Sequence, residues 1–192
     1  MHEVSFDQII KDYLTGEDLQ MTTYEDIRQS LARILVEEKG YPHDNIIPRY
    51  ELELDLTDRK YTIKIDFVVI FDNRPVLILG FCPGAVSTFI TQYVSAGRLI
   101  PEGPASFAVI TDSKDASLVR ISDKKELCRG FHCIPTWDYL QTLYHECEHA
   151  IFSPERLEKE KRVAHAMFAL SDGYCSDKCT PTTGKFQDRS RS

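Results

Sequence analysis

The sequence predicts an α/β fold, a mixed β-sheet flanked by helices, and two adjacent strand-like runs near its centre are the main evidence. The first run, residues 62–71, alternates, so its odd-numbered apolar side chains are expected to share one face: Ile63, Ile65, Phe67, Val69 and Phe71. The second run, residues 76–81, is continuously apolar, which is typical of a buried central strand. The residues between them, 72–75, have the composition of a turn.

The N-terminal part of the chain is expected to contain two helices and one further strand. Over residues 6–14 the apolar side chains lie near helical spacing, and Gly16 is expected to end this first helix. A stronger apolar stripe begins at Tyr24 and is stopped by the Lys-Gly-Tyr-Pro sequence at residues 39–42. Residues 46–56 then have the pattern of a strand that precedes the central pair.

The C-terminal half alternates between helix and strand signals. In chain order these are a helix at residues 85–99, strands at 105–111 and 117–121, a polar stretch at 122–129, and closing helices at 135–151 and 153–173. The last helix is marked by Ser153, Pro154 and Glu155, which are an N-cap, a first-turn proline and a first-turn acid. We therefore expect one domain over residues 1–171 and a polar, flexible, cysteine-containing tail over residues 172–192.

The composition argues against two broad classes of protein. A formal net charge of -7 disfavours binding to nucleic acid by overall charge, but it leaves a local basic patch open. No apolar run reaches the ~20 residues that a membrane helix needs. The first residues also lack the basic and apolar regions of a signal peptide. The sequence therefore predicts a soluble, cytoplasmic protein with no membrane partner.

Five segments together resemble a known family, the small proteins related to the N-terminal nuclease domain of type I restriction enzyme R subunits. This family belongs to the PD-(D/E)XK superfamily. The segments are YEDIRQSLARILVEEKGYP, IKIDFVVIFDNRPVLILGFCPG, YVSAGRLI, FAVITD and SPERLEKEKR, and they run in this order from Tyr24 to Arg162. The resemblance implies a restriction-endonuclease-like core.

The resemblance also implies where an active site would lie. In such nucleases a helix acid, a strand acid and the acid of an E-x-K triplet bind Mg²⁺, and the lysine orients or activates water. The helix acid corresponds to Glu25 and the strand acid to Asp66, but Gly80 and Cys82 stand at the positions of the triplet's acid and lysine. Glycine offers no side-chain ligand, and a thiol is a poor magnesium ligand without a fixed charge. We therefore expect a catalytically inactive nuclease-fold protein without a cofactor, which retains binding to DNA or to a protein partner.

Two alternatives stay open at this site. Lys64 shares a strand face with Asp66 and could replace the missing lysine, which would give an active Mg²⁺-dependent DNA endonuclease. Alternatively, Glu25 only caps its helix in a capping box with Thr22, and Asp66 is a structural partner of Lys64 or of an arginine. Cys82 is interpreted as a small apolar strand residue.

Zinc is a further alternative, through two groups of residues. Residues 145–149 match the H-E-x-x-H motif of zinc metallopeptidases, although the expected apolar stripe leaves His145 and His149 facing solvent. A second group combines Cys175, Cys179 and His165. The spacing of Cys128 and Cys133 departs further from that of a zinc knuckle, and the default for all six cysteines is a free thiol.

Overall fold

The computed structural model of the chain describes residues 4–57 and 59–175. Its strands are β1 (Ser5–Lys11), β2 (Asp18–Thr22), β3 (Ile46–Asp55), β4 (Lys60–Phe71), β5 (Arg74–Phe81), β6 (Phe107–Thr111), β7 (Ala116–Arg120) and β8 (Lys125–Arg129). Its four α-helices are α1 (Thr23–Arg33), α2 (Val86–Arg98), α3 (Trp137–Glu146) and α4 (Pro154–Cys175). Short helical segments of other types are Ile34–Glu38, which continues α1 with wider π-type turns, and the 3₁₀ turns His43–Asn45 and Phe131–Cys133.

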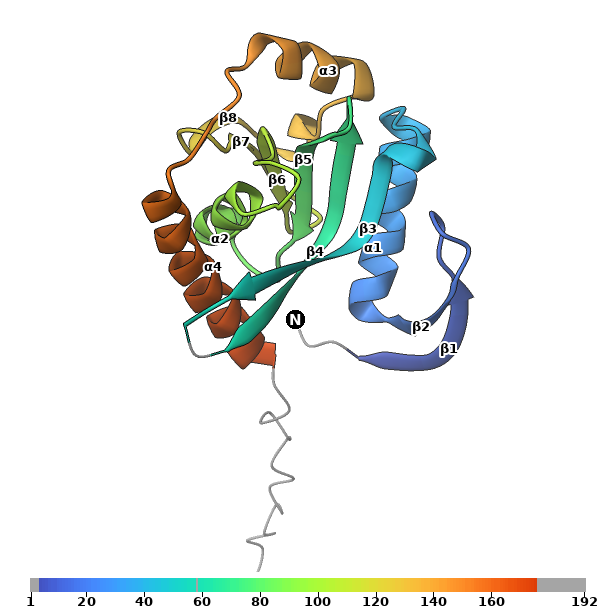
Figure 1. Cartoon of the computed structure of the whole chain (residues 1–192). Helices are drawn as coiled ribbons and strands as arrows, with labels where there is room; N and C mark the ends of the chain where they lie inside the picture. Colours follow the sequence, from blue (N-terminus) through green and yellow to red (C-terminus); the bar gives the residue numbers. More distant parts are fainter. Residues whose placement is uncertain (1–3, 58, 176–192) are drawn as a thin grey trace, which may run out of the picture.

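The strands form one large sheet and one small sheet (Figure 1). The large sheet has the order β3-β4-β5-β6-β7-β8, and the small sheet pairs β1 with β2. Only β5 and β6 run parallel in the large sheet, and α2 is the crossover that connects them. The predicted α/β fold, with a mixed sheet and two C-terminal helices, is confirmed.

The turn between β4 and β5 follows directly from its sequence. Asp72 and Asn73 have φ of 52° and 57°, and Phe71 pairs with Arg74 across them. Two consecutive residues with positive φ make the tight hairpin turn whose twist matches that of the flanking strands, and Asp and Asn tolerate this conformation well. The hairpin places β5 in the middle of the sheet, where residues 76–80 are all buried.

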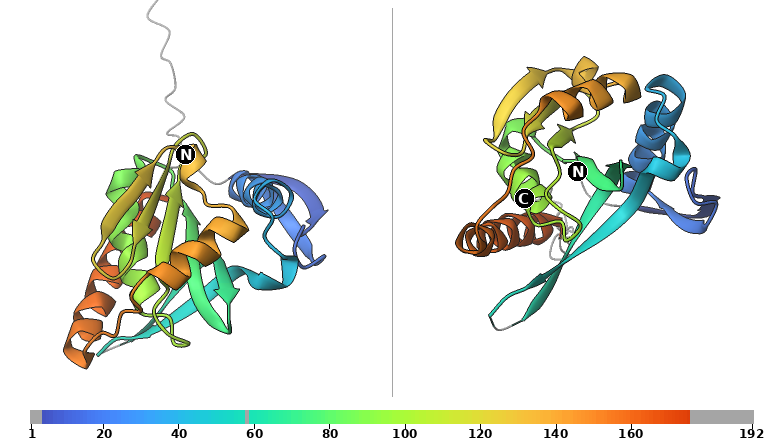
Figure 2. Two further views of the ribbon diagram at one scale, coloured as in Figure 1. Left: turned by 90° about the horizontal axis from the view of Figure 1, so that it is seen from above. Right: turned by 45° about the horizontal axis from the view of Figure 1, so that its top comes forward.

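Helices cover both faces of the large sheet (Figures 1 and 2). One buried cluster lies between the sheet and helices α2 and α4, and a second lies between the sheet and helices α1 and α3. Ile63 and Ile65 of β4 belong to the first cluster, whereas Phe67 and Val69 belong to the second. The prediction that these odd-numbered side chains share one face is therefore wrong, because β4 changes faces at residue 66.

The change of face coincides with a distortion of the neighbouring strand. Arg49 of β3 lies across from Asp66, between the paired residues Pro48–Phe67 and Tyr50–Ile65, and it has a φ of 49°. A left-handed conformation is unusual for arginine and bends the strand at this point. Arg49 and Asp66 both line the site described below.

The helix expected over residues 6–14 is wrong, because this segment forms β1 and the turn after it. Its backbone pairs with β2 in an antiparallel hairpin, and Phe6 and Ile9 remain 53% and 60% exposed. Asp12 ends the strand by accepting hydrogen bonds from the backbone N–H groups of Leu14 (2.9 Å) and Thr15 (2.7 Å). The helically spaced apolar residues of this segment therefore do not form the buried face of a helix.

Three other boundaries differ from the expected ones. The polar stretch at residues 122–129 contains the edge strand β8, which pairs with β7. Helix α3 ends at Glu146 instead of residue 151, and α4 continues to Cys175 instead of ending near residue 173. Most of the tail expected over residues 172–192 lies outside the described residues.

A buried ion pair fixes α4 against α2. Nη1 of Arg98 donates to Oε1 of Glu160 at 2.8 Å, and the two side chains are only 6% and 5% exposed. Ser95 donates to the other carboxylate oxygen at 2.6 Å. Burial alone would raise the pKa of Glu160, but the Ser95 hydrogen bond and the Arg98 charge bring it below its usual value. The carboxylate is therefore ionised inside the fold.

We expect Arg98→Met to destabilise the fold by about 3–5 kcal/mol, because it leaves a buried carboxylate without its main partner. Arg156→Met is a matched control: its Nε donates to the same Glu160 oxygen at 2.6 Å, but its side chain is 52% exposed. That change should cost no more than about 1 kcal/mol. Urea unfolding followed by circular dichroism measures both, and equal losses would contradict the role given to Arg98.

Candidate functional site

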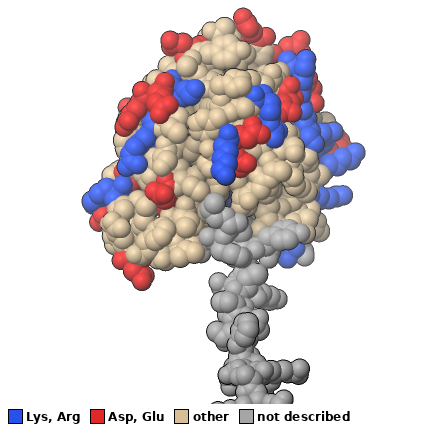
Figure 3. Space-filling view, turned by 180° about the vertical axis from the view of Figure 1, so that it is seen from behind, with Lys and Arg blue, Asp and Glu red and all other residues tan. Residues whose placement is uncertain are grey.

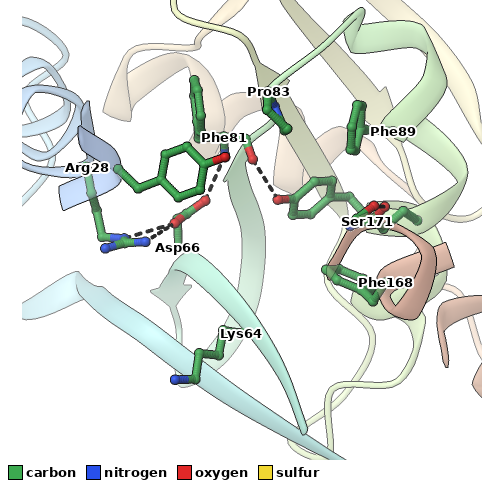
Figure 4. Close-up of a pocket in the computed structure, with 11 residues that line it drawn as sticks. Arg28, Lys64, Asp66, Phe81, Pro83, Phe89, Phe168 and Ser171 are labelled. Atoms are coloured by element: carbon green, nitrogen blue, oxygen red, sulfur yellow. Dashed lines mark hydrogen bonds and ion pairs between the residues drawn. The ribbon is translucent and has the colours of Figure 1, made fainter. Parts of the chain in front are cut away.

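Asp66 of β4 has both carboxylate oxygens occupied by N–H donors (Figure 4). Oδ2 accepts a hydrogen bond from the backbone N–H of Phe81 in β5 at 2.7 Å. Oδ1 accepts from Nε of Arg28 in α1 at 2.9 Å and lies 2.8 Å from Nη2 of the same guanidinium. Two nitrogens of the guanidinium thus share one oxygen, so the pair is charge-assisted but is not the bidentate form that uses both carboxylate oxygens. Asp66 is thereby fixed between two secondary-structure elements.

Arg28 lies between two carboxylates. Beyond its bonds to Asp66, its Nη1 donates to Oε2 of Glu25, which precedes it by three residues in α1. Glu25 is itself only 6% exposed. Burial alone would lower the pKa of Arg28, but the charges of Asp66 and Glu25 raise it above its usual value. The guanidinium is therefore a permanent cation between the helix acid and the strand acid.

A second arginine extends the cluster to the N-terminal hairpin. Nη1 of Arg49 donates to Oδ2 of Asp12 at 2.5 Å and lies 3.8 Å from Oε1 of Glu25. The Gln29 amide bridges these two acids, donating to Asp12 at 2.9 Å and to Glu25 at 2.7 Å. Burial alone would raise the pKa of Asp12, but hydrogen bonds led by that from Arg49 lower it to about 2. Asp12, Glu25 and Asp66 thus belong to one connected network with the two arginines.

Gly80 of β5 faces the ring of Tyr93, which projects from α2. A Cβ atom added at Gly80 would lie 2.0 Å from ring carbons Cε1 and Cζ of Tyr93, far inside van der Waals contact. The ring is held in place, because its hydroxyl donates to the backbone oxygen of Phe81 at 3.1 Å and its edge packs on Phe168 of α4 with ring centroids 5.7 Å apart. The space that a side chain at position 80 would need is already filled.

Cys82 follows β5 and is fully buried in the cluster beneath α2 and α4. Burial raises the pKa of its thiol to about 11, so the sulfur stays protonated at neutral pH. The sulfur donates to the backbone oxygen of Gly84 at 3.3 Å. Cys82 therefore supplies neither a charge nor a metal ligand to the cleft.

Two adjoining pockets, of about 300 and 440 Å³, open in front of Asp66. Lys64 lines both, is exposed, and makes no ion pair or hydrogen bond with the residues that the structure describes. In Figure 4 its ammonium lies clear of the Asp66 carboxylate. The smaller pocket is walled by aromatic rings: Tyr24, Phe81, Phe89, Tyr93 and Phe168. The cleft thus combines one uncommitted cation with flat apolar walls.

These contacts bear on two hypotheses about the acids. Thr22 does cap α1, since its hydroxyl accepts from the Glu25 N–H at 3.1 Å, but the Glu25 carboxylate is turned toward Arg28 and Gln29. The capping interpretation therefore holds for the backbone N–H of Glu25 but not for its side chain. The structural partner expected for Asp66 is Arg28 rather than Lys64.

The H-E-x-x-H geometry expected at residues 145–149 is absent. Helix α3 ends at Glu146, and Cys147 is already extended with φ of -89° and ψ of 148°. His145 and His149 therefore do not share a helix face. His145 packs edge-on against Phe71 with ring centroids 5.7 Å apart, and His149 lies 4.5 Å from the ring of Tyr144. This correction removes the geometric basis of the peptidase interpretation.

The other expected zinc group is only partly described. Nε2 of His165 lies 3.2 Å from Nη2 of Arg59, and its ring packs edge-on against Tyr61 with ring centroids 4.8 Å apart. Cys179 and the side chain of Cys175 lie outside the described residues. The grouping of these three residues stays a prediction.

On the face opposite to the view of Figure 1, Lys and Arg side chains are interspersed with Asp and Glu side chains (Figure 3). Arg120 pairs with Asp123 at 2.6 Å, and Arg129 pairs with Asp115 at 2.7 Å and with Glu126 at 3.3 Å. In exposed pairs of this kind the neighbouring carboxylate offsets the arginine charge, which weakens the attraction of the arginine for the phosphates of a nucleic acid.

Sequence reasoning missed four residues of the site: Asp12, Arg28, Arg49 and Tyr93. Arg28 carried a usable signal, because it lies three residues after Glu25 and therefore on the same helix face. Asp12 and Arg49 carried none, since their roles depend on a hairpin and on a left-handed strand residue. Tyr93 lies within the helix expected at residues 85–99, but nothing in its spacing points to Gly80.

Comparison with known proteins gave one result. A family model described as type I restriction enzyme R protein N terminus matches residues 23–135. Neither the curated proteins nor the solved structures contain a significant match. Within the described part of the chain, no helix combines the length and the apolar character needed to cross a membrane.

We expect Gly80→Ala to destabilise the protein by about 1–3 kcal/mol, because the new methyl group overlaps the fixed ring of Tyr93. The same change in a Tyr93→Ala background should cost little. A double-mutant cycle of unfolding free energies should therefore give a coupling energy between positions 80 and 93 above about 1 kcal/mol. Gly84→Ala is the control, since its Cβ would lie 3.5 Å from Phe89, an ordinary contact. Additive effects at positions 80 and 93 would refute the proposed overlap.

Proposed function

Because the chain belongs to the family of the type I restriction enzyme R protein N terminus, we propose that it is a nuclease-derived domain that binds DNA without cleaving it. The observation that carries this proposal is the place of Arg28. Its guanidinium bonds both Glu25 and Asp66, the two acids that an active PD-(D/E)XK nuclease would direct at Mg²⁺. A cation that cannot leave the protein thus neutralises the acids that would bind the metal.

The remaining parts of a magnesium site are also missing. Magnesium requires several oxygen ligands in near-octahedral geometry, and one or two of these are usually carboxylates beside the substrate phosphate. Both oxygens of Asp66 are occupied, Gly80 offers no carboxylate, and Tyr93 fills the space in front of it. A Mg²⁺ ion placed beside Arg28 would in addition face a like charge. We therefore assign no metal-dependent step to this cleft.

The cleft nevertheless has features that suit a DNA strand. Lys64 offers an exposed ammonium to a phosphate, and the rings of Tyr24, Phe81 and Phe89 border the same pocket. Bases stack on aromatic side chains without sequence preference, whereas lysine contacts the backbone as a point charge. A pocket of about 300 Å³ accommodates one unstacked nucleotide, so we favour a single strand or a frayed end over an intact duplex.

One observation favours a second candidate, an active endonuclease with a rearranged site. Lys64 and Asp66 line the same two pockets, which is the arrangement that a substitute lysine would need. This candidate requires the Arg28–Asp66 pair to open before a metal could bind. The two candidates differ in whether Mg²⁺ or Mn²⁺ produces cleaved DNA.

We expect the purified protein to retard single-stranded DNA at low salt without cleaving it in Mg²⁺, Mn²⁺ or EDTA. Lys64→Ala should weaken binding and lower the slope of log K against log salt by about 1, because one phosphate contact is lost. Lys60→Ala is the control, since Lys60 lies on the same strand, pairs with Glu53 and Asp55, and does not line the cleft. Metal-dependent products that vanish in Asp66→Ala would establish the endonuclease instead. Absence of retardation would refute DNA binding.

We expect Arg28→Gln to create a binding site for Mn²⁺ that the natural protein lacks, because the carboxyl groups of Glu25 and Asp66 then face one another without a guanidinium between them. Thermal unfolding should show a Tm that rises with Mn²⁺ for this variant alone. Adding Asp66→Asn to Arg28→Gln should abolish the rise. A similar Mn²⁺ response in the natural protein would show that the guanidinium does not occupy the place of the metal.

A further inference from the structure

A second group of ligand atoms lies at the far edge of the sheet, in the segment that joins β8 to α3. Cys128 of β8 and Cys133 of the following 3₁₀ turn form a disulfide, with their Cα atoms 5.6 Å apart. Nε2 of His132 lies 3.7 Å from the sulfur of each cysteine. Among the residues that the structure describes, only this group brings three His, Cys, Asp or Glu ligand atoms within 4.8 Å of one another.

The backbone of this segment holds the imidazole over the two sulfurs. Gly130 has φ of 107°, its N–H donates to the backbone oxygen of Ala116 at 2.8 Å, and its own oxygen accepts from the Cys133 N–H at 2.9 Å. A Cβ at Gly130 would lie 2.7 Å from Cε1 and 2.8 Å from Nδ1 of His132. Glycine is thus required both for the left-handed turn and for the close approach of the ring.

We propose that, once the disulfide is reduced, Cys128, His132 and Cys133 bind one Zn²⁺ ion. Zinc holds thiolates at about 2.3 Å and imidazole at about 2.0 Å, so a tetrahedral site separates sulfur and nitrogen by about 3.6 Å. The two observed distances of 3.7 Å already match this value. The two sulfurs have to move apart once their bond is broken, and rotation about the side-chain bonds of the cysteines and of His132 allows the three ligand atoms to adjust.

The surroundings leave room for a fourth ligand. A pocket of about 340 Å³ opens at the three ligands and is bordered by Lys39, Thr136 and Tyr139. His132 is exposed, so water can reach the three ligands and complete the coordination. Two soft thiolates and an imidazole select Zn²⁺ over the hard cation Mg²⁺. This site is therefore chemically distinct from the acidic network around Asp66.

A low-molecular-weight thiol is the reductant that converts the disulfide-bonded state into the metal-binding state. Two such thiols attack and reduce the Cys128–Cys133 disulfide in turn, leave as their own disulfide, and return both protein sulfurs as thiols. Zinc then displaces one proton from each thiol, while neutral His132 donates the lone pair of Nε2. The same three residues would thus close the segment by a covalent bond under oxidising conditions and by a metal under reducing conditions.

Cobalt titration of the full chain, kept reduced with a phosphine, tests this proposal. We expect one Co²⁺ per chain with thiolate-to-metal charge-transfer bands, displaced by Zn²⁺. His132→Asn should weaken binding at least about tenfold, and Gly130→Ala should also weaken it while all three ligands remain. Cys147→Ser and His149→Asn are controls, since a free cysteine and a histidine outside the group should not matter.

Several results would overturn the proposal. Binding that survives His132→Asn and Cys128→Ser would place the metal elsewhere in the chain, for example at Cys175 and Cys179. A reduced protein that takes up no Co²⁺, or a disulfide that resists reduction in the folded protein, would exclude the site. Because His132 is exposed, its replacement should leave folding intact, and circular dichroism of each variant verifies this.

Discussion

The placement of one guanidinium between two carboxylates determines the arrangement of the whole cleft. Arg28 ties α1 to β4 through Asp66, and its second contact, with Glu25, aligns the start of the same helix. Gln29 and Arg49 continue this network to Asp12, which anchors the N-terminal hairpin. A charged network under partial burial is stable only when every member has a partner, and here each acid has at least two. The cleft is thus ordered by the protein's own cations.

The central elements of the fold were predictable because burial and periodicity agree there. Residues 76–80 are continuously apolar and all buried, and the Asp-Asn turn before them has the required positive φ values. The first strand was not predictable, since its apolar residues have helical spacing and two of them, Phe6 and Ile9, are largely exposed. Its conformation depends on pairing with β2, a contact that local sequence does not encode.

The family resemblance named individual positions of the candidate site but not the residues that contact them. Glu25, Asp66 and Gly80 were recognised through the family resemblance, but the residues that neutralise or fill these positions come from other elements. The H-E-x-x-H match failed for a related reason, because a motif does not specify that its helix ends at Glu146. Partnership across elements depends on strand register and helix packing, and a single sequence gives neither.

The contact between Gly80 and Tyr93 bears on how this chain can change over evolutionary time. Any side chain at position 80 requires space that the ring occupies, while loss of the ring opens a cavity beside Phe168. Either single change is expected to lower stability, so substitutions at the two positions are expected to depend on one another. Sequence change in this chain is therefore expected to be tolerated more readily at the mouth of the cleft than at this pair.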